Sequence, residues 1–325
     1  MRISLIIPCY NEGSSLPILY SALLDVKTSL DAHDLTFIFI DDGSKDNTLE
    51  TLRELSEKDA CVSYISFSRN FGKEAAMYAG LIEANGDLVA IMDADMQDPP
   101  SLLPHMLQMM IDKDCDVVAT RRVSRKGEPP IRSFFARRFY RIINRMSDVE
   151  IVDGARDFRL MKRQVVDAII EVSERQRFSK GIFSWVGFKT FWVEYENVER
   201  AAGETKWSFW KLFKYAVEGI VAFTTVPLRL ATITGFIVSC AAFAYMLYYI
   251  FRAIILRLYD QVPGYPSLLS IILFLGGLIL LALGILGEYL ARTYMEVKQR
   301  PLFIAKEKHA PHVTEDSKNE ENEVT

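Results

Sequence analysis

Two aspartates one residue apart are the first feature of this sequence that points to chemistry. Asp93 and Asp95 directly follow the apolar run 88–92, and Gln97 adds an amide oxygen two residues later. Hard oxygen ligands suit Mg²⁺ or Mn²⁺, which proteins hold with few side chains and with phosphates of the substrate. The alternative is an ordinary surface loop, because Asp-x-Asp alone is a common pattern. The surrounding sequence is needed to distinguish a metal site from a surface loop.

The first 120 residues alternate between patterns typical of strands and of helices. This alternation predicts an α/β fold with a mostly parallel sheet and helices on both faces. Ligands of such sheets bind at the carboxyl ends of the strands. The expected strands are residues 2–7, 36–40, 62–67, 88–92 and 115–119, and the expected helices are about 14–30, 46–58, 73–84 and 101–113.

Polar clusters follow three of the expected strands. They are residues 8–12, residues 41–44 and residues 93–97. Like charges at one sheet edge repel each other unless a metal or hydrogen-bond donors compensate them. The sequence contains neither a G-x-G-x-x-G nor a G-x-x-x-x-G-K-[ST] motif, so a dinucleotide-binding protein and a P-loop kinase are both disfavoured.

Overall composition narrows the class of protein further. A net charge of −4 over 325 residues gives no reason to expect a nucleic-acid partner. The four cysteines are scattered and form no C-x-x-C pair, which is typical of reduced thiols in a cytoplasmic domain.

Two uncharged stretches predict a C-terminal pair of transmembrane helices. Residues 230–251 and 261–287 contain no charged side chain, and each is longer than the roughly 20 residues that cross a bilayer as a helix. The alternative, a buried helix of a soluble protein, does not readily explain two such stretches. We expect the spans at about 230–251 and 266–289.

The flanking charges predict the orientation of these spans. The N-terminus does not resemble a signal peptide, because Pro8 and Glu12 interrupt its short apolar run. Basic residues precede the first span and follow the second, so the positive-inside bias predicts a multi-pass protein of the inner membrane with both termini in the cytoplasm. These basic residues are Lys206, Lys211, Lys214, Arg229, Arg292, Lys298 and Arg300.

Two other segments predict helices that lie in the membrane interface. Residues 131–146 combine an apolar side with five arginines, and residues 207–228 are rich in tryptophan and other aromatic residues. For 131–146 the alternative is an ordinary helix with its arginines in solvent. The expected organisation is a catalytic domain over 1–206, the interfacial helix 207–228, the spans within 229–292 and a cytoplasmic tail 293–325. Within that tail, residues 306–325 have a composition typical of disorder.

Four motifs together resemble the family 2 glycosyltransferases with a GT-A fold. They are Ile6-Ile7-Pro8-Cys9-Tyr10-Asn11-Glu12, residues 41–46, residues 93–100 and residues 203–208. The resemblance covers about residues 1–300 and is to the polyisoprenyl-phosphate subgroup, which includes dolichyl-phosphate mannose synthase and the bactoprenol glucosyltransferases. The two spans resemble the bactoprenol enzymes most. Processive members carry Q-x-x-R-W, which residues 176–178 do not match, so transfer of a single sugar is expected.

This resemblance implies a nucleotide-sugar site. Asp42 would accept a hydrogen bond from the base, Asp93 would contact the ribose and, through the metal, the diphosphate, and the metal ligands would be Asp93, Asp95 and Gln97. Plainer alternatives are a strand end at Pro8, a turn at Asp42 and a helix start at Lys73. The residues implied for the nucleotide sugar are Pro8, Tyr10, Glu12, Asp42, Lys73, Asp93, Ala94 and Asp95.

The implied reaction is an inverting transfer in which a metal on Asp95 stabilises the departing diphosphate. A polyprenyl phosphate has a second pKa of about 6 by analogy with phosphorylated side chains, so near neutral pH it is already a nucleophilic dianion. Asp157 lies at the usual base position of the family, and we expect it to position the acceptor or the sugar. The alternative is a salt bridge from Asp157 to a neighbouring arginine.

A dianionic acceptor calls for cations, and arginine binds phosphate through two hydrogen bonds. Resemblance to dolichyl-phosphate mannose synthase favours Arg121 and Arg132 most, although any one of these cations alone could be a solvated surface residue. The residues expected to bind the acceptor phosphate are Arg121, Arg122, Arg132, Arg200 and Lys206.

The resemblance implies an enzyme that moves one sugar, from UDP-glucose or a similar UDP-hexose, to undecaprenyl phosphate for modification of a cell-envelope glycan. UDP is favoured over GDP in this subgroup. The alternatives are a processive polysaccharide synthase and an inactive sugar-nucleotide-binding assembly protein. Glycines at 276, 277, 284 and 287 would allow close helix packing, so we expect a homo-oligomer.

Overall fold

An eight-stranded, mostly parallel sheet forms the centre of the main domain. The computed structural model describes residues 1–122, 144, 152, 154–172, 174–195, 224–254 and 265–309. Nearly all of the expected interfacial helices, together with Arg132, Arg200 and Lys206, lie outside these residues. The strands are β1 (Arg2–Cys9), β2 (Asp34–Asp41), β3 (Val62–Phe67), β4 (Leu88–Ile91), β5 (Val117–Arg122), β6 (Ala155–Lys162), β7 (Thr190–Tyr195) and β8 (Ala305–His309), in the order β7-β5-β6-β4-β1-β2-β3-β8.

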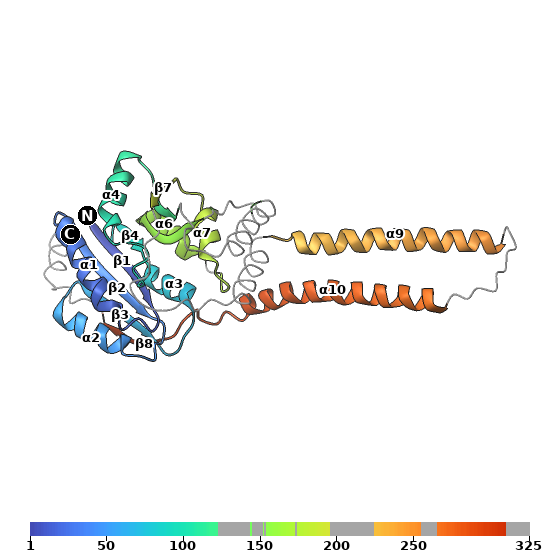
Figure 1. Ribbon diagram of the computed structural model, residues 1–325, viewed down its shortest axis with the longest axis horizontal. Coiled ribbons are helices and arrows are strands. Elements are labelled where there is room, and N and C mark those ends of the chain that lie inside the picture. Colours follow the sequence, from blue (N-terminus) through green and yellow to red (C-terminus); the bar gives the residue numbers. More distant parts are fainter. Residues whose placement is uncertain are drawn as a thin grey trace, which may run out of the picture.

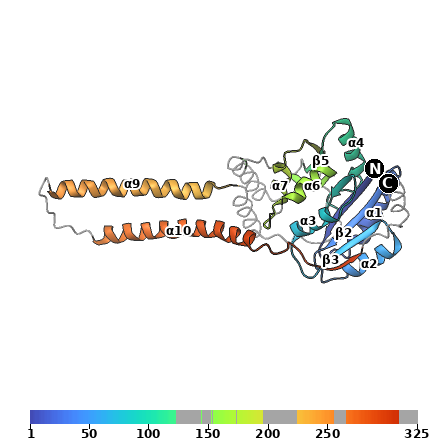
Figure 2. The ribbon, with the colours of Figure 1, turned by 180° about the vertical axis from the view of Figure 1, so that it is seen from behind.

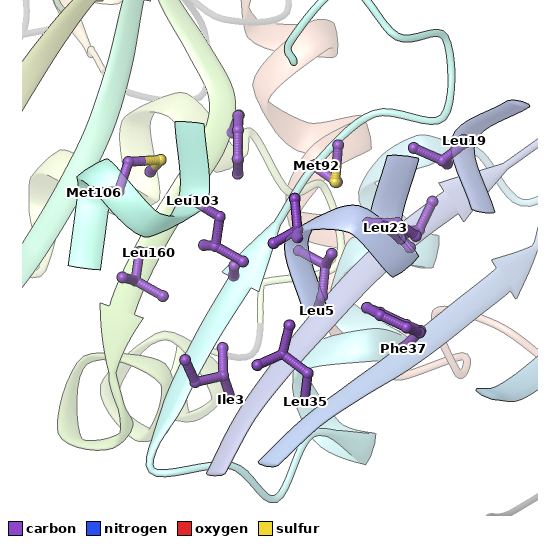
Figure 3. Close-up of a cluster of buried hydrophobic side chains, with 14 of the residues drawn as sticks. Ile3, Leu5, Leu19, Leu23, Leu35, Phe37, Met92, Leu103, Met106 and Leu160 are labelled. Atoms are coloured by element: carbon purple, nitrogen blue, oxygen red, sulfur yellow. The ribbon is translucent and has the colours of Figure 1, made fainter. Parts of the chain in front are cut away.

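Helices cover both faces of the sheet and enclose two apolar cores (Figures 1 and 2). Side chains alternate along a strand, so Leu5 of β1 enters one core and Ile6 enters the other. Figure 3 shows the first core, where Leu23 and Leu103 lie near Leu5. The first core is covered by α1 (Leu16–Ser29), α2 (Thr48–Lys58) and α4 (Leu102–Asp112), and the second by α3 (Lys73–Glu83), α6 (Arg163–Glu171) and α7 (Ser179–Trp185).

The direction of β6 determines which residues meet at the carboxyl edge of the sheet. Strands β1 to β5 share one direction, whereas β6 is inserted antiparallel between β4 and β5. Ile91 pairs with Arg159 and Arg121 pairs with Ala155. The beginning of β6 therefore lies at the same edge as the carboxyl ends of its neighbours. This arrangement confirms the predicted α/β sheet and places Asp157 between the ends of β4 and β5.

Two long apolar helices extend from one side of the main domain as a hairpin (Figures 1 and 2). They are α9 (Val226–Ile254) and α10 (Tyr265–Val297), and the stretches Val226–Tyr245 and Phe274–Val297 are long and apolar enough to cross a membrane. The hydroxyl of Tyr289 donates to the carbonyl of Thr224 over 2.6 Å. A side chain on the glycines at 276, 277, 284 and 287 would meet nothing within 4 Å in the described part of the chain.

The C-terminal end of α10 is attached to the main domain. Glu296 accepts hydrogen bonds from the backbone N–H groups of Arg175, over 2.8 Å, and of Gln176, over 3.3 Å. These two residues belong to the segment just before α7. In both views α3, α6 and α7 lie on the side of the sheet that faces the hairpin.

Residues 306–309, which the composition predicts to be disordered, instead belong to strand β8, so this part of the prediction is wrong. The segment pairs antiparallel with β3, whose outer edge would otherwise expose unpaired backbone groups. Glu307 accepts hydrogen bonds from Arg53 and from the Tyr64 hydroxyl, and the ring of Phe303 stacks on Phe67 with centroids 4.9 Å apart. Composition misses this strand because its charged side chains are compatible with an edge position.

We predict that Phe303→Ala destabilises the protein by about 2 kcal/mol, since it removes a half-buried ring from the second core. Thermal unfolding of the full chain in detergent would show a midpoint lower by several degrees. Lys306→Ala, at an exposed position of the same segment, is the matched control and leaves the midpoint unchanged. Equal midpoints for the two variants would show that the packing of the Phe303 ring, just before β8, contributes nothing to stability.

Candidate active site

Asp42 forms the end of the site nearest β3. Its side chain is 3% exposed and accepts hydrogen bonds from the backbone N–H groups of Phe71, over 2.6 Å, and of Gly72, over 2.9 Å. Burial raises the pKa of the Asp42 carboxyl, and these two donors act in the opposite direction. Gly43 has a positive φ of 65°, and a Cβ there would lie 2.4 Å from the backbone of Arg69. The turn that carries Asp42 is thereby held against the segment before α3.

The loop after β1 is held against the loop after β2. Asn11 adopts a positive φ of 55°, its N–H donates to the Ser44 hydroxyl over 2.9 Å, and its side-chain oxygen accepts from the N–H of Lys45 over 2.9 Å. The N–H of Glu12 donates to the Thr48 hydroxyl over 2.9 Å. The sequence-predicted residues of these two loops are thus brought together at one edge. Pro8 lies within β1 rather than at its end.

Lys73 joins the two carboxylates at the centre of the site. Its ammonium lies 2.5 Å from Oδ1 of Asp93 and also donates a hydrogen bond to Oδ2 of Asp157. Burial lowers the pKa of Lys73, but the two carboxylates outweigh it and hold that pKa well above the usual range. Burial likewise raises the pKa of Asp157, and the charges of Lys73 and Lys180 bring it well below the usual range. Asp157 is therefore a fixed anion, and its ion-pair partner is Lys73.

The loop after β4 is fixed by contacts that the sequence does not predict. Met96 has a positive φ of 60°. Arg156, at the start of β6, donates to Oε1 of Gln97 over 2.9 Å and to Oδ1 of Asp98 over 3.1 Å, and Asp98 also accepts from the Tyr195 hydroxyl. Asp98 is fully buried, and this burial raises its pKa. Arg156 and Asp98 thus position the Asp-x-Asp segment.

The carboxylates fit a metal that is bound largely by its substrate. In the described part of the chain, no three acidic, histidine or cysteine side chains converge into a metal cage. Mg²⁺ typically takes one or two protein carboxylates and completes its shell with phosphate oxygens and water. Asp93 and Asp95 can supply those two ligands. The Gln97 oxygen already accepts from Arg156, so a metal would have to share or displace that bond.

Arg121 and Arg122 end β5, beyond Asp157 along the sheet edge. Arg121 lies 3.9 Å from Glu194, and its buried Nε has no hydrogen-bond partner in the described structure. Gly154, with a φ of 80°, brings the start of β6 close to this point, since a Cβ there would lie 2.6 Å from the Arg122 carbonyl oxygen. Arg121 and Arg122 therefore lie at the carboxyl edge of the sheet, as expected.

Three residues that position the site have no role in the sequence analysis: Asp98, Arg156 and Tyr195. Asp98 belongs to the motif 93–100 and Arg156 directly precedes Asp157, so both lie next to residues that the sequence does single out. Tyr195 reaches Asp98 only because β7 pairs with β5, which no local pattern indicates.

Comparison with known proteins assigns the chain to a family. Residues 4–170 match the model of glycosyl transferase family 2, and residues 226–293 match that of the GtrB C-terminal hairpin. A prophage bactoprenol glucosyl transferase homolog of Escherichia coli is 43% identical over 306 residues, which are 94% of this chain and 99% of the relative. The SfII prophage-derived bactoprenol glucosyl transferase of Shigella flexneri is 42% identical over 95% of this chain and 99% of its own length.

Among solved structures, glucosyl-3-phosphoglycerate synthase of Mycobacterium tuberculosis, in complex with Mn²⁺, UDP-glucose and phosphoglyceric acid, is 18% identical with a TM-score of 0.43. The alignment covers 68% of this chain and 77% of that one. A likeness this remote adds nothing to the assignment, which rests on the matched family model and the two relatives. The chain is an enzyme that belongs to the family 2 glycosyltransferases, as its motifs predict.

Proposed function

We propose that this enzyme transfers a single glucose from UDP-glucose to undecaprenyl phosphate. The observation that carries the proposal is the position of Asp157, which is paired with Lys73 and lies between the Asp93 carboxylate and Arg121. A donor diphosphate fits on the Asp93 side, and an anionic acceptor fits on the Arg121 side. The names of the relatives, bactoprenol glucosyl transferases, supply the sugar and the lipid.

On the donor side, residues of three loops would enclose the nucleotide. Asp42 lies at the base end, and Tyr10 and Glu12 belong to the neighbouring loop, which is held in place by Ser44 and Thr48. Asp93 and Asp95 would hold Mg²⁺ or Mn²⁺, which when bound neutralises charge on the diphosphate. Lys73 adds a protein cation at the same place.

On the acceptor side, the chain does not need a general base. The acceptor phosphate, with a second pKa of about 6, is mostly a dianion near neutral pH. Asp157 is a poor proton acceptor, since its pKa is held low by Lys73 and Lys180. Its negative charge instead orients Lys73 and stands close to the position where the anomeric carbon would gain positive charge.

The hairpin would place this site at the cytoplasmic face of the membrane. The start of α9 and the end of α10 lie together on the same side of the domain, and Tyr289 of α10 bonds to Thr224 just before α9. A hairpin that crosses the bilayer twice would therefore leave the domain on one side. Basic residues near that end favour the cytoplasmic side. We extend the proposal to a homo-oligomer, in which the glycines of α10 would contact a second copy.

Transfer should depend on a divalent metal and on Asp95. We predict that EDTA lowers the rate in membranes supplied with UDP-glucose and undecaprenyl phosphate by at least about 100-fold, since a charge-stabilising group is lost. Mg²⁺ or Mn²⁺ restores the wild type but not Asp95→Ala, while Asp112→Ala, on the exposed side of α4, behaves as wild type. Mass spectrometry of the lipid measures the product. Full activity in EDTA, or several sugars on one lipid, would contradict the proposal.

Removal of the central ammonium should disable the site without unfolding the domain. We predict that Lys73→Met lowers transfer at least about 100-fold, because Asp93 and Asp157 lose the cation that offsets their mutual repulsion. Lys162→Met is the matched control, because Lys162 pairs with Asp116 at the other end of β6. A Lys73→Met rate within about threefold of the control would show that this ion pair is dispensable.

A further inference from the structure

Positive charge accumulates on the far side of Asp157, where α7 packs on β6. Arg159 is 4% exposed, and its guanidinium lies 3.5 Å from the ring centre of Phe183. Its hydrogen bonds go to the backbone carbonyls of Arg156, over 2.9 Å, and of Asp157, over 3.3 Å, not to a carboxylate. Burial lowers the pKa of Arg159 to about 10, and the charges of Asp157 and Glu74 offset this effect only in part.

Lys180 adds a second cation to this place. It is the second residue of α7, and it lines a cavity together with Arg159, Ser184 and Trp192. In the part of the chain that the structure describes, Lys180 makes no salt bridge, although its charge acts on Asp157. The cavity holds about 20 Å³, close to the room that one water molecule needs.

Among the residues that the structure describes, the two acidic groups that act on Arg159 do not fully balance these cations. Asp157 is paired with Lys73. Glu74 accepts from the backbone N–H of Ser179 over 3.0 Å and from its hydroxyl, and burial raises the pKa of Glu74 to about 7, so near neutral pH it carries only part of a charge. Arg159 is buried and Lys180 is half-buried. A buried charge without a paired counter-charge is costly, so these two cations point to an anionic ligand.

The order of the strands indicates whether the anion bound by Arg159 and Lys180 is the donor diphosphate or the acceptor phosphate. Asp42 follows β2, Asp93 follows β4 and Asp157 lies in β6. Lys180 lies beyond Asp157, on the β5 and β7 side. The donor diphosphate belongs with Asp93. In an inverting displacement the nucleophile approaches the carbon from the side opposite the leaving group, so the anion beyond Asp157 is the nucleophile.

We propose that Lys180 and Arg159 form the subsite for the phosphate of the acceptor, with one phosphate oxygen in the cavity and the remainder at its mouth beside Lys180. This inference rests on the proposed function. A phosphate oxygen forms the new bond to the anomeric carbon while the bond from that carbon to the diphosphate breaks, and the electron pair leaves with UDP. No proton has to move.

The test uses the full chain in detergent with UDP-glucose and undecaprenyl phosphate. Lys180→Met should raise the KM for the lipid at least about tenfold and leave the KM for UDP-glucose unchanged, because it removes a charge-assisted hydrogen bond to phosphate. Lys180→Arg should recover most of the loss, and Lys162→Met should match the wild type. A rise in the KM for UDP-glucose instead, or no change in either KM, would overturn the proposal.

A binding assay separates this inference from the proposed function. Citronellyl phosphate, a short isoprenyl monoester, is titrated calorimetrically into the wild type and Lys180→Met, with citronellol as the uncharged probe. We expect binding of the phosphate only, weakened at least about tenfold in Lys180→Met. If the wild type transfers no glucose yet shows this binding, the subsite stands and the proposed function fails. Equal binding by both proteins, or none by the wild type, would refute the subsite.

Discussion

The ion pairs of Lys73 are the constraint on which the rest of the site depends. One ammonium bridges Asp93, which follows β4, and Asp157, which lies in β6, so two strands that run in opposite directions share one counter-charge. Lys73 is itself placed by the backbone before it, since the buried Asp42 carboxylate binds the N–H groups of Phe71 and Gly72. The nucleotide end of the site is thereby connected, through one short segment, to the place where the sugar would react.

Strand order places opposite charges on the two sides of Asp157. Antiparallel β6 lies between β4 and β5, so the carboxylates after β4 lie on one side and Arg121 and Lys180 lie on the other. In the proposed reaction the first side would bind the donor and the second the acceptor. The C-terminal part of the chain is attached to the domain at two places, because Glu296 of α10 binds the segment before α7 and β8 pairs with the outer edge of β3. If the hairpin crosses a bilayer as proposed, these contacts would determine how the sheet, and the cavity beside Lys180, faces the membrane.

Local patterns predicted most of the fold, and non-local pairing accounts for what they missed. Strands β1 to β5 and the helices between them are buried or half-buried, so their apolar runs were visible, and their ends differ from expectation by only a few residues. The Asp-x-Asp segment was equally visible. No local pattern predicted that β6 is inserted antiparallel between β4 and β5. The contacts of Asp157 with Lys73 and of Asp98 with Arg156 depend on that insertion. Strand β8 was missed because its charges resemble those of a disordered tail.

The central claim is that Asp157 is a fixed anion and that the acceptor arrives as a ready nucleophile. The most direct test is the pH dependence, from pH 5 to 8, of transfer by the wild type and by Asp157→Asn with limiting undecaprenyl phosphate. Because the charges of Lys73 and Lys180 outweigh burial and hold the pKa of Asp157 well below its usual range, Asp157 does not titrate between pH 5 and 8. Both proteins should show a rate that rises through about pH 6, the second ionisation of the phosphate, with Asp157→Asn about tenfold slower. Loss of this rise in Asp157→Asn, or a rate as low as that of Asp95→Ala, would contradict the account.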